Sequence, residues 1–151
     1  MSSRASRDRR RAEQLADDLH SAAIHLLRRL RKQDVASGLS PARLSALSVI
    51  AFGGPLRISE LARAEQVRTP TVTPIVGALE AQGLIVRETD AKDARAAVLR
   101  ATPKGQKLMA EGRARRVATL AAQLRALPAR DVAVLEKAAA LLQKLVRERM
   151  L

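Results

Sequence analysis

The sequence has no cysteine, no tryptophan and no tyrosine among its 151 residues. Without cysteine the chain cannot form a disulfide, a thiolate zinc site or a thiol-based redox switch, and it fits a reducing compartment such as the cytoplasm. Phe52 is the single aromatic residue. Folds that bind single-stranded DNA or RNA stack bases on aromatic side chains, so the sequence disfavours this class of protein.

Long apolar runs are also missing. No uninterrupted apolar segment approaches the ~20 residues that a membrane helix needs. The Ser/Arg-rich beginning of the chain lacks the apolar stretch of a secretory signal. We therefore expect a cytoplasmic protein and no membrane partner.

The motifs of common enzyme classes are absent as well. The sequence contains no glycine-rich phosphate loop, no metal-ligand cluster and no nucleophile elbow. Asp90 and Asp93 form a close acidic pair, but they lie in a polar segment without the burial that retunes catalytic acids. We expect no enzymatic activity, no cofactor and no metal site.

What the sequence has in excess is positive charge. It carries 28 Lys and Arg against 15 Asp and Glu, a net charge of +13. An excess of this size indicates a polyanionic partner, most often nucleic acid. The charge is weak support when taken alone, since many arginine-rich chains are simply basic.

The hydrophobic pattern is mainly helical. Residues 1–11 are Ser/Arg-rich and predict a disordered basic arm, whereas residues 12–32 place Leu and Ala at the spacing of an amphipathic helix. Further helices are predicted at 103–126 and 129–149. The inward-pointing residues expected on the second of these are Val132, Leu135, Ala139, Leu142, Leu145 and Val146. Three Ser/Thr-Pro pairs have the cap-plus-proline signature of a helix start: Ser40-Pro41, Thr69-Pro70 and Thr102-Pro103.

The middle of the chain combines two helices and a hairpin. A short helix at 59–64, a turn at Val67 and a helix ending before Gly83 predict a helix-turn-helix. The spacing of Val72, Val76 and Leu79 places them on one face of the second helix, and Gly83 fits the left-handed position that ends it. The β-prone runs 84–87 and 97–100 flank the polar segment TDAKDARA, which is typical of a hairpin loop. The predicted fold is mainly α with a small antiparallel β wing, that is, a winged helix-turn-helix.

Residues 40–105 resemble the MarR family of bacterial transcriptional regulators. The matching segments are RISELARAEQV, TPTVT, LEAQGLIVRETDAKDAR and ATPKG. Helices in the expected order extend the resemblance to residues 12–150. It implies a DNA-binding domain at 40–102 and a helical dimerisation region formed by 12–39 and 103–151.

The resemblance also implies a function. It predicts a homodimer that binds double-stranded DNA at a near-palindromic operator, as a ligand-responsive repressor. DNA binding would associate the protein with the bacterial nucleoid. An alternative is a nucleoid-type or adaptor protein with weak sequence preference.

Candidate DNA-binding residues gather at the start of the second helix of the motif. A helix N-terminus offers unpaired N–H groups and a positive dipole end to a phosphate. Arg68 lies beside this end, and the threonine hydroxyls can reach phosphates or base edges. The expected contact residues are Arg68, Thr69, Pro70, Thr71, Thr73 and Pro74.

The wing supplies the other candidates through the resemblance. It implies that Arg95 enters the minor groove, that Asp93 orients Arg95, and that Lys92 meets backbone phosphates. The alternative for Asp93 and Arg95 is an ordinary surface ion pair, which contributes little to stability.

Three positions depart from the family pattern. Pro74 stands where the family usually has a basic residue, and Ala78 stands where it often has another. Ala94 stands where a further arginine is frequent. Pro74 lies inside the predicted helix, where it removes a backbone hydrogen bond and tends to bend the helix. DNA affinity is therefore expected to depend strongly on Arg68, Lys92 and Arg95.

The resemblance also implies a small aromatic or anionic effector, bound between the dimer helices and the DNA-binding head. His20 and His25 on the first helix and Arg43 on the second are the candidate pocket residues. The alternative for all three is ordinary packing or solvent exposure. The two histidines are five residues apart and do not share a helix face, which disfavours a zinc site.

Overall fold

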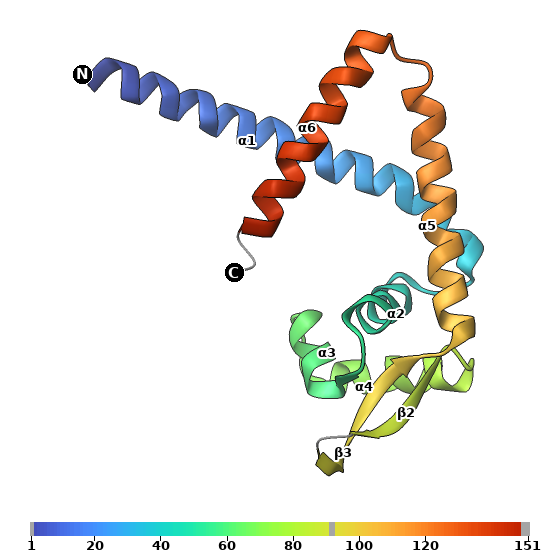
Figure 1. Ribbon diagram of the computed structural model, residues 1–151. Helices are drawn as coiled ribbons and strands as arrows, with labels where there is room; N and C mark the ends of the chain where they lie inside the picture. The colour runs from blue at the N-terminus through green and yellow to red at the C-terminus, as the bar shows by residue number, and fades with distance from the viewer. Residues whose placement is uncertain (1, 91–92, 149–151) are drawn as a thin grey trace. The chain divides into compact units, whose positions relative to one another are not determined.

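The computed structural model describes residues 2–90 and 93–148 of the chain. Its elements run in the order shown in Figure 1. They are α1 (Ser2–Arg31), the 3₁₀ helix η1 (Lys32–Ser37), α2 (Pro41–Gly53), β1 (Leu56–Arg57), α3 (Ile58–Ala64), α4 (Thr69–Ala81), β2 (Ile85–Asp90), β3 (Asp93–Ala101), α5 (Pro103–Leu124) and α6 (Ala129–Glu148). The chain divides into two compact units, residues 1–115 and 116–151. The fold is mainly helical with a small antiparallel sheet, which confirms the predicted class.

The three Ser/Thr-Pro pairs all mark helix starts. Ser40 caps α2, where its hydroxyl accepts from the amide of Arg43 at 3.4 Å. Thr102 accepts from the amide of Gly105 at 3.1 Å in the first turn of α5. Thr69, by contrast, is the first residue of α4 and not its cap. The extended residue before the helix is Arg68, whose carbonyl accepts from the amide of Thr71 at 2.9 Å.

Helix α1 is longer than the sequence indicated. It begins at Ser2 and runs through the segment for which composition predicted a disordered arm. Bonds between residues four apart support the helix there: Arg9 pairs with Glu13 at 2.9 Å, and Arg10 donates to the carbonyl of Ser6 at 3.4 Å. Arginine also favours helix, and such pairs add a little stability.

The sheet has the strand order β1-β3-β2 and is antiparallel throughout. Strand β2 pairs with β3 from Ile85 opposite Ala101 to Asp90 opposite Asp93, with an irregularity between Thr89 and Asp90. The strands therefore extend into the segment predicted to be a loop. The polar side chains of that segment do not prevent backbone pairing in an exposed hairpin. The hairpin projects from the helices around it (Figure 1).

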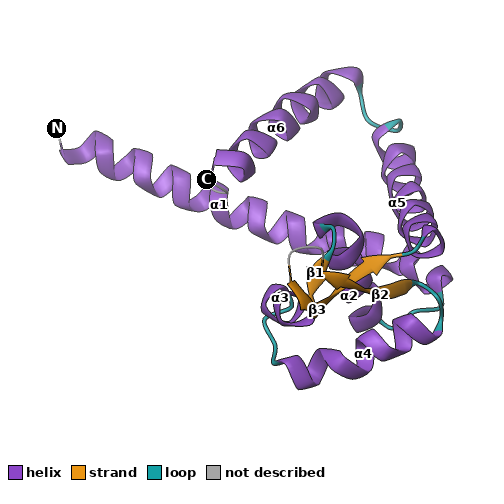
Figure 2. Cartoon of the chain, turned by 60° about the horizontal axis from the view of Figure 1, so that its bottom comes forward, coloured by secondary structure: helices purple, strands orange, loops and turns teal. Residues whose placement is uncertain are grey.

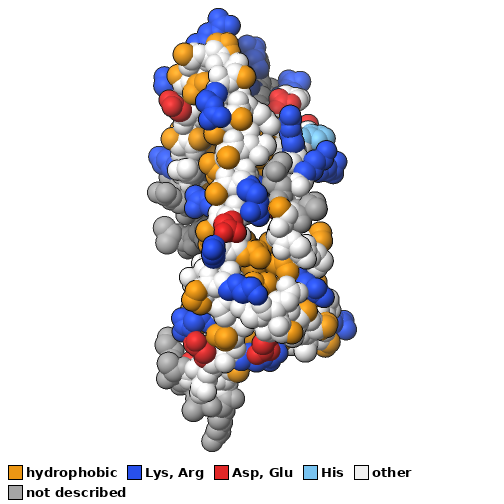
Figure 3. Space-filling model, turned by 90° about the vertical axis from the view of Figure 1, so that its right-hand side faces the viewer, with side chains coloured by type: hydrophobic (Ala, Val, Ile, Leu, Met, Phe, Trp, Pro, Cys, Tyr) orange, Lys and Arg blue, Asp and Glu red, His pale blue; other side chains and the backbone are white. Residues whose placement is uncertain are grey.

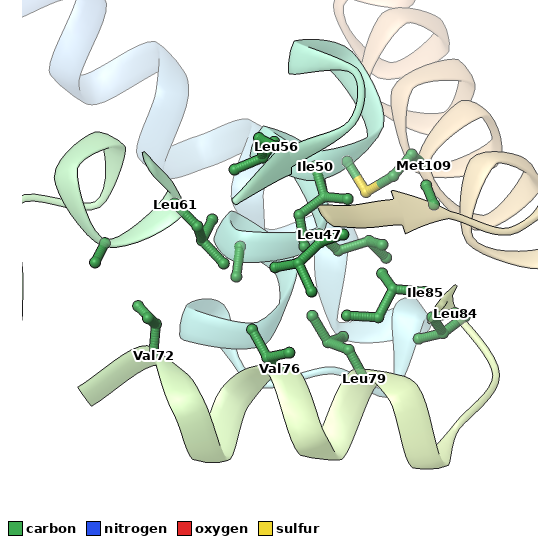
Figure 4. Close-up of a cluster of buried hydrophobic side chains, with 14 residues drawn as sticks. Leu47, Ile50, Leu56, Leu61, Val72, Val76, Leu79, Leu84, Ile85 and Met109 are labelled. Carbon is green, nitrogen blue, oxygen red and sulfur yellow. The ribbon is translucent and has the colours of Figure 1, made fainter. Parts of the chain in front are cut away.

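The hydrophobic core belongs to the middle of the chain. Among the residues whose burial the structure describes, fourteen hydrophobic residues are buried, and all of them lie between Ala46 and Met109. Helix α4 contributes Val72, Val76 and Leu79, which share one helix face, as predicted. Figure 4 shows these three side chains pointing from α4 toward Leu47 of α2. The residues from α2 to the first turns of α5 thus form one head, which we call the head below.

A close junction fixes the end of α4 against the start of α5. Gly83 has a φ of +67°, the left-handed conformation predicted for this glycine. Thr102 donates to the carbonyl of Gly83 from its hydroxyl, at 2.7 Å, and to the carbonyl of Leu84 from its amide, at 3.0 Å. A Cβ on Gly105 would overlap the carbonyl oxygen of Leu84. Only glycine fits at this point without a shift of the backbone.

The terminal helices are different from the head. From Ala5 to Arg29, every residue of α1 is exposed. Among the described residues after Gly112, none is buried. The hydrophobic stripe of α6 that was predicted to point inward is exposed within the single chain, at Leu135, Leu142, Leu145 and Val146.

Candidate nucleic-acid interface

Helices α3 and α4 form the predicted helix-turn-helix, and the turn between them is held by backbone bonds. The amide of Glu65 donates to the carbonyl of Leu61, and the amide of Val67 to that of Ala62, both at 2.9 Å. The Glu65 carboxylate also accepts from the hydroxyl of Ser45 on α2 at 2.9 Å. The turn that presents the start of α4 is therefore bound to α3 through its backbone and to α2 through Glu65.

The predicted contact residues meet on the surface at the start of α4. Val72, Val76 and Leu79 occupy the buried side of the helix, so the other side faces outward. Figure 2 shows that this outer side is not covered by the other elements of the head. The six candidates from the helix start are all exposed: Arg68, Thr69, Pro70, Thr71, Thr73 and Pro74.

Helix α4 continues through Pro74 without interruption from Thr69 to Ala81. Pro74 has no N–H to donate to the carbonyl of Pro70. One residue earlier, the hydroxyl of Thr73 donates to the carbonyl of Thr69 at 2.9 Å. Glu80 is the only charged residue on α4, and it accepts from Arg87 of β2 at 3.1 Å. The helix presents no basic side chain.

The end of β2, close to the turn of the hairpin, is attached to the start of the helix-turn-helix by an ion pair that local sequence patterns did not predict. Arg57 donates from Nη2 and Nε to Asp90 Oδ2 at 2.8 and 3.2 Å. The Asp90 side chain is only 16% exposed. The amide of Arg57 donates to the carboxylate of Glu60 in the first turn of α3, at 2.6 Å. Arg57 thus connects the start of α3 to the point where the hairpin changes register. Because the two partners are 33 residues apart, no local motif could reveal them.

Two of the three predicted wing residues lie at the start of β3. Asp93 and Arg95 are the first and third residues of that strand. Lys92 lies outside the described residues. The same hairpin carries a second ion pair, between Arg100 and Glu88 at 2.7 Å.

The three candidate pocket residues lie on α1 and α2. His20 and His25 are exposed on α1, and Arg43 is half-buried on α2. In the described part of the chain, no hydrogen bond or ion pair joins their side chains to one another. Residues 2–90 and 93–148 also contain no group of three or more His, Asp or Glu side chains able to hold a metal.

The surface charge agrees with the composition. Figure 3 shows Lys and Arg side chains predominating over Asp and Glu on one face of the protein, with hydrophobic side chains among them. None of the helices in the described ranges combines the length and the hydropathy that crossing a membrane requires.

A helix-turn-helix with an exposed second helix, followed by a β-hairpin, defines the winged helix-turn-helix class of DNA-binding proteins. Comparison with known proteins gives the family. The sequence profile of the MarR family matches residues 37–96. An HTH-type transcriptional regulator of Mycobacterium leprae is 32% identical over 134 residues, which cover 89% of this chain and 94% of the relative. The chain belongs to the MarR family of DNA-binding transcriptional regulators, which are not enzymes.

Other relatives agree with this assignment. The transcriptional repressor MdtR of Bacillus subtilis is 31% identical over 117 residues, covering 75% of this chain and 76% of MdtR. A transcriptional regulator of Thermotoga maritima superposes with a TM-score of 0.80 at 26% identity, over 91% of this chain and 97% of that protein. CouR of Rhodococcus jostii, solved with bound p-coumaroyl-CoA, shares the fold with a TM-score of 0.60 at 24% identity, over 89% and 92% of the two chains.

Proposed function

We propose that this protein is a homodimeric repressor that binds a near-palindromic duplex sequence through the start of α4 and the wing. The observation that carries the proposal is the contrast between the outer side of α4, which is free for DNA, and the apolar residues that α1 and α6 leave uncovered. The name of the relative MdtR supports repression rather than activation.

The uncovered apolar residues support the dimer. Large exposed hydrophobic residues are spread along α1 and α6: Leu15, Leu19, Ile24, Leu26, Leu27, Val134, Leu135, Leu141, Leu142, Leu145 and Val146. An apolar surface of this extent marks an interface in a protein that is stable in water. In a two-fold dimer the two α4 helices would lie about one DNA turn apart (~34 Å).

The exposure of Arg68 and of the start of α4 supports the DNA contacts assigned there. In the proposed complex, Arg68 and the amides of the first turn of α4 meet a phosphate, while Thr71 and Thr73 lie within reach of the groove. Arg95 enters the minor groove, with Asp93 orienting it and Lys92 on the backbone. Replacing Arg95 with Ala is expected to lower operator affinity at least about tenfold. An unchanged gel shift would remove Arg95 from the interface.

The proposal is tested by selecting bound duplexes from a random pool with the full-length protein. The expected result is a near-palindrome whose half-sites are one helical turn apart. Recovery of single, unpaired half-sites would contradict the dimeric arrangement, and recovery of no common sequence would contradict specific recognition.

A second function is favoured by one feature of α4. Because that helix has no basic side chain, the protein could bind duplex DNA with little sequence preference, as nucleoid-type or adaptor proteins do. A salt series distinguishes the two functions. A specific regulator keeps a large ratio of affinities for the selected duplex and random DNA as salt rises, whereas a non-specific protein shows a ratio near one throughout.

We further propose that a small aromatic or anionic effector relieves repression, by binding near His20, His25 and Arg43 in the dimer. The structural relative CouR, which was solved with p-coumaroyl-CoA, supports an effector of this class. An effector works by shifting the population of DNA-binding and non-binding states. Screening aromatic acids for release of a bound operator tests the proposal. Release that persists in an Arg43→Ala variant would exclude Arg43 from the pocket.

A further inference from the structure

The outer side of α4 carries two prolines one helical turn apart, which we call the proline ridge (Pro70 and Pro74). Val72, Val76 and Leu79 fill the buried side of the helix. At about 100° per residue, Pro70 and Pro74 lie opposite these three side chains. Both prolines are exposed, and so are Gly77 and Ala81 farther along the same side.

Packing within the chain does not explain Pro74. Proline is the least favourable residue in a helix interior, because it lacks the N–H and its ring crowds the preceding turn. An exposed proline at this position gains little from the core. Its pyrrolidine ring is instead presented where the family's DNA-binding helix meets DNA.

Few groups on α4 can donate a hydrogen bond to a base. The only side-chain donors on the helix are the hydroxyls of Thr69, Thr71 and Thr73. The hydroxyl of Thr73 already donates to the carbonyl of Thr69. Glu80 is an acceptor that is bonded to Arg87. The helix therefore lacks the Arg, Lys, Asn or Gln side chains that read guanine or adenine with paired hydrogen bonds.

The major groove offers one group that suits an apolar ridge, the 5-methyl group of thymine. Residues four apart on a helix present their Cβ atoms ~5–6 Å from each other. Successive base pairs are ~3.4 Å apart. The two rings can therefore contact methyl groups about two base-pair steps apart.

We propose that Pro70 and Pro74 are specificity-determining residues that read thymine methyl groups in each half-site. The proposal rests on the proposed function, specific duplex binding through α4. The affinity itself comes from the basic residues beside the helix and on the wing, which contact phosphates. The proline ridge selects among sequences and contributes little to binding of random DNA.

The test replaces thymine with deoxyuridine in the selected duplex, one position at a time, and measures binding by fluorescence anisotropy. Deoxyuridine pairs like thymine and lacks only the methyl group. Each methyl that is buried against a proline ring is expected to be worth about fourfold in affinity. Affinity should fall by this factor at one or two thymines per half-site and remain unchanged at the others.

Proline variants separate direct contact from an effect of the methyl group on DNA shape. In Pro74→Ala, the penalty for deoxyuridine should disappear at one position and persist at the other. Pro70→Ala should show the converse. Alanine favours helix, so α4 is retained in both variants. Pro41→Ala is the matched control, because Pro41 also lies in the first turn of a helix, α2, and it should leave every penalty unchanged.

Three results overturn the proposal. One is a selected half-site without thymine, and another is equal affinity for the thymine and deoxyuridine duplexes at every position. The third is a deoxyuridine penalty that persists at every position in both Pro70→Ala and Pro74→Ala. In each of these cases specific binding itself stands. If no duplex is preferred over random DNA, the proposed function fails and this proposal fails with it.

Discussion

The head and the terminal helices differ in whether their hydrophobic residues are buried. In the described part of the segment from Ala46 to Met109, fourteen hydrophobic residues are buried against one another. Helices α1 and α6 are also amphipathic in sequence, yet most of their leucines and valines are exposed. The same 3.6-residue pattern therefore produces a closed core in one region and an uncovered surface in the other.

The difference shows that an amphipathic helix indicates burial without saying what buries it. In the head, short connections and a three-stranded sheet bring the partners from the same chain. In the terminal helices the partners are missing within the chain, and a second copy supplies them in the proposed dimer. The head should then be stable by itself, whereas the terminal helices should depend on association.

The largest effect is expected from a charge on the apolar side of α6. Leu142→Glu places a carboxylate in the proposed dimer interface, where losing its hydration costs several kcal/mol. The dimer dissociation constant should rise at least about 100-fold. Light scattering over a concentration series measures it. Ala140→Glu adds the same charge on the polar side of α6 and should leave the dimer intact. Equal effects of the two changes would remove α6 from the interface.

The next largest effect is expected on stability, where the end of α4 packs closely against the start of α5. Gly105→Ala introduces a Cβ that overlaps the carbonyl oxygen of Leu84 and lies 3.3 Å from Leu47 Cδ1. We expect a loss of about 3 kcal/mol in the free energy of unfolding. Urea denaturation measures this loss.

Gly77 provides the control for Gly105, since it also lies within a helix. A Cβ at Gly77 would have no neighbour within 4 Å. Gly77→Ala should stabilise the protein by about 0.5–1 kcal/mol, because alanine favours helix. A small loss at Gly105 would mean that the junction of α4 and α5 yields easily.

A smaller effect is expected from loosening the wing. Asp90→Asn removes the carboxylate charge that pairs with Arg57, so the end of the hairpin is held less firmly in the free protein. DNA binding must then order the hairpin, which costs part of the binding free energy. Operator affinity should fall about fivefold, which corresponds to about 1 kcal/mol. Anisotropy with the selected duplex measures the change.

Glu88→Gln is the matched control for Asp90→Asn. It removes one negative charge from the same strand and breaks the more exposed pair with Arg100. Operator affinity should change by less than about twofold. If both variants lost affinity equally, charge alone would explain the effect and the Arg57–Asp90 pair would have no positioning role.

The smallest effect is expected in the turn before α4. Gln66 has a φ of 56°, a left-handed conformation that strains a residue with a Cβ. Gln66→Gly should raise the free energy of unfolding by about 0.5–1 kcal/mol. Gln82→Gly, at a residue with a φ of −84°, should lower it by a similar amount. Thermal unfolding distinguishes the two signs, and a loss at both positions would show that Gln66 is not strained.

Local chemistry made much of the head predictable. A hydroxyl before a proline specifies a helix start through groups a few residues apart, and this fixed the beginnings of α2 and α5. The 3.6-residue spacing identified Val72, Val76 and Leu79 as the buried side of α4. Pro70, Thr71 and Pro74 lie outside that side of the helix and are exposed.

Long-range chemistry was not predictable. The pairing of β1 with β3 joins Leu56 to Leu99, and the Arg57–Asp90 pair joins residues 33 positions apart. The hairpin was predicted too short because its outer part is polar, although strand pairing there requires only backbone groups. The TPKG segment was recognised through the resemblance to the MarR family. Its physical role, the close packing of Gly105 against Leu84, became visible only in the structure.

The most direct measurement compares the selected palindrome with a duplex in which one half-site has been scrambled, at the same salt concentration. Two heads joined in a dimer bind the second half-site at high effective concentration. The affinity is therefore expected to fall at least about 100-fold when that half-site is lost. A fall of only about twofold, the statistical factor for heads that bind independently, would contradict the dimer and with it the role assigned to α1 and α6.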